Sequence, residues 1–194
     1  MRLPIDGAIL AGGQSRRMGT PKESLLLTEQ VTFLRHAHRI LSEALSGAVW
    51  ISRPYGFIPE TVFDVPDRRA HQGPLNGILE VLPRASSPVI AVLAVDLPNI
   101  PVSLWPLLYD VWCAHPESGV IYPVAGDDAQ PLAALWSRSA IPIISQALGD
   151  DRVPKVMDVV QNLNPTRVFL KDREWLLNVN TPDDLNVLWR RWHA

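Results

Sequence analysis

A run of glycines and cations stands near the N-terminus of this 194-residue chain. Gly12 and Gly13 open the run, and Arg16, Arg17 and Lys22 follow them. Glycines let the backbone turn tightly and approach a ligand, because they carry no Cβ. Backbone N–H groups exposed in such a turn bind phosphate oxygens, and arginine and lysine side chains add positive charge. The pattern predicts a phosphate-binding loop.

This loop differs from the two commonest phosphate-binding loops. The spacing Gly-x-x-x-x-Gly-Lys-Ser/Thr is missing, since Thr20 follows Gly19, and the sequence contains no Gly-x-Gly-x-x-Gly. Both a P-loop and a dinucleotide-binding site are therefore disfavoured. The plainer alternative is a glycine turn with solvated basic side chains.

Asp96 is the second candidate for chemistry. It follows an uninterrupted apolar run over residues 88–95, which is typical of a buried strand. Open α/β sheets bind ligands at the carboxyl ends of their strands, and Mg²⁺ prefers one or two carboxylates together with phosphate and water oxygens. We therefore expect Asp96 to hold Mg²⁺, with a turn or capping aspartate as the alternative.

Three further segments offer polar contacts to a ligand. The run Gly73-Pro74-Leu75-Asn76-Gly77 opens a helix, whose N-terminus suits an anion or a base. Asn178 and Asn180 precede the last helix, where Thr181 already supplies the cap. Of the two asparagines, Asn180 is the preferred candidate near the metal or the second substrate. Arg152 suits the phosphate of that second substrate, or is a solvated surface arginine.

The elements that must position these groups alternate along the chain. Short apolar runs predict strands, and apolar residues at helical spacing predict helices between them. The alternation indicates an α/β domain of three layers, and we expect residues 1–194 to form a single domain. The predicted strands cover residues 5–11, 48–52, 61–65, 88–95, 119–124, 132–136 and 166–170. The predicted helices cover residues 31–45, 75–82, 102–113 and 139–148, and a last one starts at Pro182.

The composition narrows the class of protein. Hydrophobic residues make up 47% of the chain and charged residues 20%, which excludes wholesale disorder. A net charge of -2 argues against nucleic acid as a partner. The single cysteine, Cys113, excludes an intrachain disulfide, and no apolar run is long enough for a membrane span or signal peptide. We expect a cytoplasmic protein without membrane contact.

The loop sequence Leu-Ala-Gly-Gly-x-Ser-x-Arg-Met-Gly-x-x-Lys resembles the signature of the molybdenum cofactor guanylyltransferases and related nucleotidyltransferases. Four further segments match this family in order, so that the resemblance runs from Gly7 to about Leu188. They are Gly73-Pro74-Leu75-Asn76-Gly77, Ala94-Val95-Asp96-Leu97-Pro98, Gln130-Pro131-Leu132 and Asn178-Val179-Asn180-Thr181-Pro182-Asp183-Asp184-Leu185.

The resemblance implies a fold, a reaction and a set of site residues. The fold is a three-layer Rossmann-like nucleotidyltransferase domain with a mostly parallel central sheet. The reaction joins the GMP part of GTP to the phosphate of molybdopterin, with Mg²⁺, and releases pyrophosphate. The residues implied to contact the nucleotide are Leu10, Ala11, Gly12, Gly13, Lys22, Ser52, Asp67, Gly73, Pro74, Leu75, Asp96 and Asn180.

This reaction needs positioning and charge neutralisation rather than a nucleophilic side chain. We expect Lys22 and Arg16 or Arg17 to stabilise the leaving pyrophosphate, and Asp96 to act through Mg²⁺. One departure from the family pattern is Pro21, which stands where Asp is common and which lacks an N–H group.

Two other functions stay open. One is a related nucleotidyltransferase that uses CTP or another phosphorylated acceptor, and the other is a non-catalytic GTP-binding accessory protein, which Pro21 suggests. The protein partners expected are those that make molybdopterin or receive the finished cofactor, in transient contact.

Overall fold

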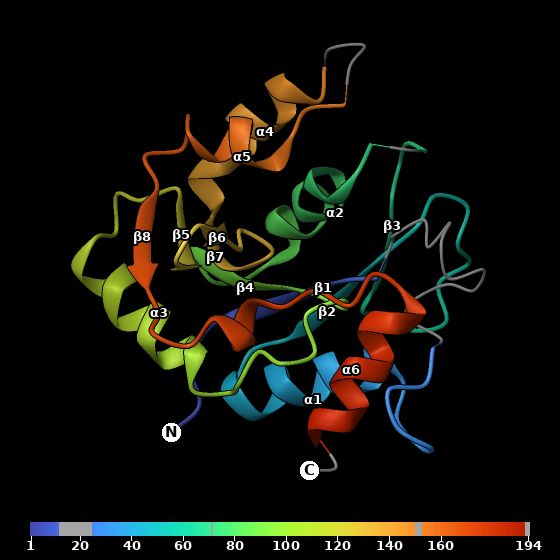
Figure 1. The fold of residues 1–194 in the computed structure, drawn as a ribbon. Helices are drawn as coiled ribbons and strands as arrows, with labels where there is room; N and C mark the ends of the chain where they lie inside the picture. Colours follow the sequence, from blue (N-terminus) through green and yellow to red (C-terminus); the bar gives the residue numbers. More distant parts are fainter. Residues whose placement is uncertain (12–24, 71, 150–152, 193–194) are drawn as a thin grey trace.

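The computed structural model describes residues 1–11, 25–70, 72–149 and 153–192 (Figure 1). The predicted loop residues Gly12, Gly13, Arg16, Arg17 and Lys22 lie outside the described residues, and so does Arg152.

Within the described residues, a sheet of eight strands forms the middle layer. The strand order is β3-β2-β1-β4-β7-β5-β6, and β8 pairs with the edge of β5. β7 runs antiparallel to both β4 and β5, and β6 is antiparallel to β5, whereas the other pairs are parallel. The strands are β1 (Asp6–Leu10), β2 (Val49–Arg53), β3 (Asp64–Pro66), β4 (Val89–Ala94), β5 (Val120–Ala125), β6 (Asp128–Ala129), β7 (Ala133–Ser137) and β8 (Thr166–Phe169). The prediction of a mostly parallel sheet is confirmed.

Helices cover both faces of this sheet. Figure 1 shows α1, α3 and α6 on one side, and α2, α4 and α5 on the other. The expected three-layer α/β architecture is therefore the observed one. The helices are α1 (Phe33–Ala44), α2 (Pro74–Val81), α3 (Leu104–Ala114), α4 (Ile141–Ala147), α5 (Val156–Val160) and α6 (Pro182–Trp192), with short 3₁₀ turns η2 (Leu82–Arg84), η3 (Arg138–Ala140) and η4 (Arg173–Leu176).

The hydrophobic core follows the strands in the middle of the sheet. Every residue of β1, β4, β5 and β7 is buried. An apolar run without polar alternation is the pattern required when both faces of a strand are covered. The apolar run over residues 88–95 therefore predicts a strand, as observed in β4.

Several elements differ from the sequence expectation. The strand expected over residues 61–65 is displaced to β3 (Asp64–Pro66), because Asp64 accepts hydrogen bonds from Glu60 N and Thr61 N and thereby holds the preceding residues in a turn. The two-residue β6 and the five-residue α5 were not expected. Both are too short to produce a periodic pattern.

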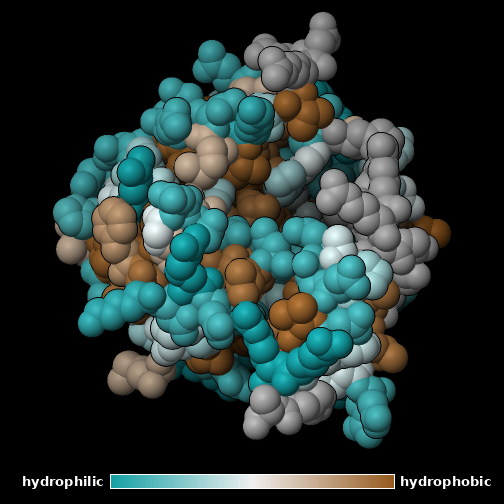
Figure 2. Space-filling model, in the orientation of Figure 1, coloured by the Kyte–Doolittle hydropathy of each residue, from teal (hydrophilic) through white to brown (hydrophobic). Residues whose placement is uncertain are grey.

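The described helices include none that is long and apolar enough to cross a membrane. The surface seen in the orientation of Figure 1 mixes hydrophilic and apolar side chains, and apolar atoms gather in a hollow near its centre (Figure 2). Cys113 is free and exposed on α3.

Candidate functional site

The carboxyl ends of β1, β2, β3 and β4 meet at one edge of the sheet. In the parallel register, Leu10 pairs with Ser52 on one side and with Ala94 on the other. Hydrogen bonds continue this pairing beyond the strands, from Ala11 N to Ser52 O at 3.1 Å and from Val95 N to Leu10 O at 3.3 Å. The predicted phosphate-binding loop therefore starts between the end of β2 and the end of β4.

Asp96 lies at this edge, directly after β4 and Val95, and its side chain is half-buried. The turn after it closes through Leu97 N, which donates to Ala94 O at 3.3 Å. The carbonyl oxygen of Asp96 accepts a hydrogen bond from Val179 N at 2.9 Å. The structure thus brings together two segments that the sequence analysis selected separately, the one around Asp96 and the one around Asn180.

The segment around Asn180 is fixed by the start of α6. Asp184 Oδ2 accepts from Asn180 N and from Thr181 N, each at 2.8 Å, and Asp184 N donates to Thr181 Oγ1 at 3.2 Å. This reciprocal cap confirms that Thr181 precedes the helix and that Pro182 is its first residue.

Gln130 supports the same segment from the neighbouring strands. Its side-chain amide donates to the carbonyl oxygen of Leu176 at 3.1 Å and to Asn178 Oδ1 at 3.2 Å. Gln130 opens the family motif Gln130-Pro131-Leu132, which by itself indicates no role for the glutamine. The structure shows that Gln130 holds the chain that leads to Asn180, whose own side chain is exposed.

Asp67 lies on the other side of the loop's starting point. Its backbone N–H donates to Arg53 O at 2.8 Å, so it continues the pairing of β3 with β2. Burial raises the pKa of Asp67 to about 6; the adjacent Asn76 amide opposes this shift, and the Glu80 carboxylate adds to it. The Asp67 side chain is mostly ionised at neutral pH, and because it is partly buried, this ionisation lowers the free energy of unfolding.

Asn76 lies within the predicted Gly73–Gly77 segment but was not selected individually, and Glu80 was not recognised in the sequence; both are buried on α2. Among the described residues, Asp67 Oδ1 and Asn76 Nδ2 are buried without a hydrogen-bond partner. Glu80 forms ion pairs with Arg68, 3.2 Å away, and with Arg84, 3.7 Å away. Residues 76, 80 and 84 are spaced four apart and therefore lie on one helix face. This spacing is the sequence signal that could have pointed to Asn76 and Glu80.

The N-terminus of α2 is shaped by two glycines. Gly73 has a φ of 72°, in the left-handed region, and Pro74 takes the first position of the helix. A Cβ on Gly77 would lie 2.2 Å from Ser52 Oγ, so α2 can approach β2 only because residue 77 is glycine. Ser52 is accordingly buried beneath α2, and Leu75 is buried as well, whereas Gly73 and Pro74 are half-buried.

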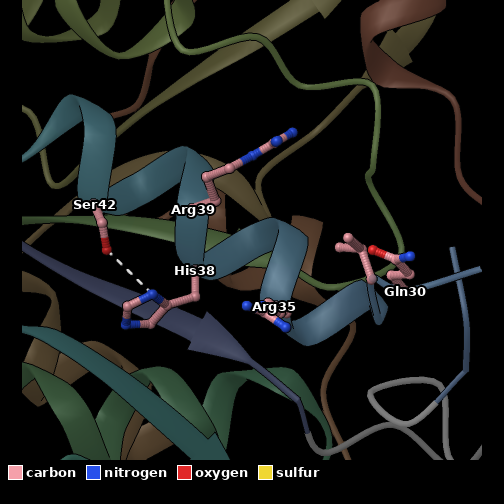
Figure 3. Close-up of a pocket in the computed structure, with 6 residues that line it drawn as sticks. Gln30, Arg35, His38, Arg39 and Ser42 are labelled. Atoms are coloured by element: carbon pink, nitrogen blue, oxygen red, sulfur yellow. Dashed lines mark hydrogen bonds between the residues drawn. The ribbon is translucent and has the colours of Figure 1, made fainter. Parts of the chain in front are cut away.

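A surface cavity of about 470 Å³ lies beside α1, away from the predicted motifs (Figure 3). Among the predicted site residues that the structure describes, none lines it. Ser42 Oγ and His38 Nδ1 lie 3.2 Å apart on its wall, as the dashed line in Figure 3 marks. The lining residues are Gln30, Val31, Arg35, His38, Arg39 and Ser42. In the described part of the chain, no three His, Cys, Asp or Glu side chains gather in a group able to hold a metal ion.

The three-layer fold, in which β1 ends between β2 and β4 at the carboxyl edge of the sheet, is that of a domain of the nucleotidyltransferase class. The chain belongs to the family of the MobA-like NTP transferase domain, whose model matches residues 7–166. The protein is therefore a nucleotidyltransferase enzyme, as the sequence motifs led us to expect.

Similarity to individual relatives extends over nearly the whole chain. A molybdenum cofactor guanylyltransferase of Rhizobium johnstonii is 32% identical in an alignment 203 residues long. The alignment covers 97% of this chain and 92% of that protein. A probable molybdenum cofactor guanylyltransferase of Flavobacterium johnsoniae is 28% identical over 186 residues, with 93% and 94% covered.

Solved structures share the fold at lower identity. The molybdopterin-guanine dinucleotide biosynthesis protein A of Archaeoglobus fulgidus superposes with a TM-score of 0.78 at 20% identity, over 97% of this chain and 98% of that one. A Mycobacterium tuberculosis protein crystallised as a manganese complex has a TM-score of 0.70 at 18% identity, over 98% of this chain and all of that one.

Proposed function

We propose that this enzyme transfers GMP from GTP to the phosphate of molybdopterin, which yields the molybdopterin guanine dinucleotide and pyrophosphate. The observation that carries this proposal is the pair of hydrogen bonds from Ala11 to Ser52 and from Val95 to Leu10. They hold Leu10 and Ala11, the last described residues before the loop, between the end of β2 and the end of β4, which leads into Asp96. The names of the relatives from Rhizobium johnstonii and Flavobacterium johnsoniae support guanylyl transfer to the molybdenum cofactor.

The chemical step breaks one phosphoanhydride bond and forms another. An oxygen of the molybdopterin phosphate attacks the α-phosphorus of GTP, and the bond from that phosphorus to the oxygen bridging to the β-phosphate breaks. The attacking phosphate monoester has a second pKa of about 6 and is largely dianionic at neutral pH, so the step needs no general base. In-line positioning and neutralisation of negative charge then govern the rate.

Lys22 is assigned to the triphosphate, with Arg16 or Arg17 beside it. Positive charge there stabilises the pyrophosphate as it leaves. Gly12 and Gly13 let the backbone N–H groups approach the phosphates. These assignments rest on the sequence motif, and Leu10 and Ala11, which lead into the loop, are fixed in the sheet.

Asp96 is the residue assigned to a divalent cation. The Asp96 side chain suits Mg²⁺, since it is a half-buried carboxylate at the sheet edge, and its backbone is hydrogen-bonded to the 178–180 segment, which carries two asparagines. Bound there, Mg²⁺ would supply positive charge to the α-phosphate. Asp96 would hold the ion, and Val179 fixes the backbone of Asp96 through its hydrogen bond.

Asp67 and the start of α2 are assigned to the guanine base. An ionised carboxylate accepts hydrogen bonds from two adjacent N–H donors, and the N1 and N2 positions of guanine present such a pair. Cytosine offers no equivalent pair, and this difference favours GTP over CTP. Gly73, Pro74 and Leu75 form the wall of the same pocket in this assignment.

The decisive experiment incubates the protein with Mg²⁺, molybdopterin and either GTP or CTP. We expect the guanine dinucleotide by mass spectrometry, with one pyrophosphate released for each product. A cytosine dinucleotide alone would replace the proposal with cytidylyl transfer. Tight GTP binding without any product would instead identify a non-catalytic GTP-binding protein.

Two matched pairs of variants locate the chemistry. Lys22→Ala is expected to slow transfer by about a hundredfold or more, the scale of losing one key donor to a transition state, whereas Lys171→Ala, at an exposed position, leaves the rate unchanged.

Asp96→Asn is expected to abolish the response to Mg²⁺, and the exposed Asp110→Asn serves as its control. Wild-type rates in both Lys22→Ala and Asp96→Asn would contradict the assigned site.

A further inference from the structure

Gln130 lies at the carboxyl edge of the parallel strands, although it belongs to the chain that leads into β7. Because β7 runs antiparallel to β4, the chain that enters β7 lies beside the end of β4. Ala94 N, at the end of β4, donates to Leu132 O at 2.8 Å. Gln130 comes two residues before Leu132, and Asp96 comes two residues after Ala94. Both therefore lie at the same end of these two strands.

The position of Gln130 is fixed through its backbone. Its N–H group donates to Pro123 O on β5 at 3.0 Å, and its carbonyl oxygen accepts from Ala133 N at the start of β7 at 3.2 Å. The half-buried side chain reaches from this fixed position to a segment near the C-terminus. There Gln130 Nε2 donates to Leu176 O at 3.1 Å and to Asn178 Oδ1 at 3.2 Å.

These two hydrogen bonds determine which way both side-chain amides face. The carbonyl oxygen of Leu176 can only accept, so the Gln130 atom that faces it must be the nitrogen. An amide nitrogen carries two hydrogens, and the second one is directed at Asn178, which must present its oxygen. The NH₂ group of Asn178 then points away from Gln130, and Asn178 is exposed.

Asn178 thereby offers a hydrogen-bond donor next to the segment of Asp96. The residue that follows it, Val179, donates its N–H group to Asp96 O at 2.9 Å, so the two backbones are in contact. An NH₂ group binds anionic oxygen atoms, whereas Mg²⁺ binds oxygen ligands. The orientation that Gln130 sets therefore favours a phosphate rather than a metal ion as the ligand of Asn178.

The order of the strands indicates which phosphate this is. β1 and β7 lie on opposite sides of β4. The nucleotide is assigned to the side of β1, β2 and β3, where Asp67 and the start of α2 lie. Gln130 and Asn178 lie on the side of β7, which leaves them to the second substrate, the phosphate-bearing acceptor.

We propose that Gln130 is a positioning residue for the acceptor, because it holds the Asn178 amide with its NH₂ group toward the acceptor phosphate. Without Gln130, the Asn178 amide is free to turn its oxygen toward that phosphate, where two groups of lone pairs repel each other. The inference rests on the proposed function for the identity of the acceptor, which is molybdopterin.

The first test examines the two amides in the free protein by nitrogen–proton NMR. The side-chain signals of Gln130 and Asn178 are identified by their loss in Gln130→Glu and Asn178→Asp. Because both hydrogens of Gln130 Nε2 are bonded, they are expected to exchange with water about tenfold more slowly than those of the exposed Gln161. Equal exchange at Gln130 and Gln161 would overturn the proposal.

The same spectra test the ligand class with inorganic phosphate. Phosphate added at constant ionic strength is expected to shift the side-chain N–H signals of Asn178 and to leave those of Asn186, exposed on α6, unchanged. A shift at Asn178 no larger than the shift at Asn186 would overturn the assignment of Asn178 to a phosphate.

The second test distinguishes a phosphate donor from a metal ligand. Asn178→Asp keeps an oxygen toward Gln130 Nε2 and replaces the NH₂ group by a carboxylate oxygen. The KM for molybdopterin is expected to rise by about ten- to a hundredfold, the scale of a hydrogen bond to a charged group, with a near-normal KM for GTP. Asn186→Asp adds the same charge elsewhere and is the control. A reduced Mg²⁺ requirement with an unchanged KM for molybdopterin would identify a metal ligand and overturn the proposal.

The third test reverses the polarity of Gln130 itself. In Gln130→Glu the carboxylate cannot donate, and it attracts the NH₂ group of Asn178, so the amide oxygen turns toward the phosphate. The KM for molybdopterin is expected to rise by about tenfold or more, while the KM for GTP and the rates of the control Gln161→Glu stay near the wild-type values. A protein that is merely destabilised has a lower active fraction and an unchanged KM, and that result would contradict the role of Gln130.

These tests distinguish the inference from the function on which it rests. If the wild-type enzyme makes no dinucleotide, the proposed function fails, and the NMR measurements still decide how the two amides are oriented. If the wild type is active and Gln130→Glu and Asn178→Asp behave like their controls, the positioning role is wrong while the proposed function stands. A rise confined to the KM for GTP would also overturn the assignment to the acceptor.

Discussion

Asp67 combines partial burial with a negative charge, an arrangement that is unfavourable for folding and that the proposed function assigns to binding the guanine base. Its pKa is raised to about 6 in the folded protein from a usual value of 3.8. The folded state therefore holds this proton more tightly than the unfolded state does. The stability contributed by the protonated carboxyl is present below pH 3.8 and is lost as the pH rises through about 6.

We therefore predict that Asp67→Asn unfolds at a higher temperature than the wild type at pH 8, and that this advantage shrinks between pH 6 and pH 4. The same variant is expected to weaken GTP binding by about ten- to a hundredfold, the scale of a hydrogen bond to a charged group. Thermal unfolding across this pH range and calorimetric titration with GTP measure the two effects. Asp110→Asn, which alters an exposed carboxylate on α3, should show neither.

His36 presents the opposite case. Burial lowers its pKa, the contact with Pro98 O raises it, the charge of Arg39 lowers it, and that of Glu43 raises it. Arg39 Nη2 also lies 3.3 Å from His36 Nδ1, and Trp192 covers the ring. The neutral form is favoured in the folded protein, so its stability contribution is present above pH 6.5 and is lost as the pH falls through the lowered pKa.

His36→Gln retains a side-chain amide that can reach Pro98 O and removes the titrating ring. We predict that the fall in melting temperature between pH 7.5 and pH 5 is smaller in this variant than in the wild type. His38→Gln, on the exposed side of the same helix, is the control and should keep the wild-type acid sensitivity. Equal acid sensitivity in wild type and His36→Gln would show that another group is responsible.

At the scale of elements, the contact between α2 and β2 determines where the start of α2 lies. Gly77 and Ser52 meet at this contact, with no space for a Cβ on residue 77. Since α2 carries Asn76 and Glu80 beside Asp67, a shift of this helix alters the surroundings of that carboxylate as well as the packing.

Gly77→Ala is predicted to destabilise the protein by about 1–3 kcal/mol, the usual cost of overpacking a core. For a chain of this length each kcal/mol corresponds to about 2–4 °C in melting temperature. The double variant Gly77→Ala, Ser52→Ala should recover part of the loss, because it removes the oxygen nearest to the new methyl group. Differential scanning calorimetry of both variants measures the recovery, and a double variant no more stable than Gly77→Ala would exclude this contact as the cause.

At the scale of the whole molecule, one cluster of buried apolar side chains extends from Ile5, just before β1, to Leu188 on α6. We infer that residues 1–194 form a single domain, since no separate core divides the described chain. Ligand binding at the carboxyl edge is then expected to stabilise the whole chain by mass action.

GTP with Mg²⁺, at about a hundred times its dissociation constant, is predicted to add about 2.7 kcal/mol to the stability of the folded state. The melting temperature should rise by about 5–11 °C at about 2–4 °C per kcal/mol. Scanning fluorimetry with GTP, CTP and ATP, each with Mg²⁺ or with a chelator, measures this effect. An equal rise with all three nucleotides would contradict the assignment of Asp67 to the guanine base.

The predictions that succeeded from sequence rest on local physical signals. The apolar run over residues 88–95 could form only a strand covered on both faces, and the reciprocal cap of Thr181 and Asp184 could only open a helix. Predictions failed where side chains from distant segments decide the outcome. In the helix predicted over residues 102–113, helical spacing does not separate Leu107, which is 41% exposed, from Trp105, which is fully buried.

The sequence by itself determined the order of the longer strands and helices and the class of enzyme, because these depend on residue type and short spacing. Only the tertiary structure decided that Asn76 and Glu80 surround Asp67, and that Trp189 and Trp192 bridge the segments of Leu27 and Asn99. Hydrophobic periodicity specifies which face of a helix is buried. Which residues from distant parts of the chain lie against that face depends on sheet order and register, which only long-range packing establishes.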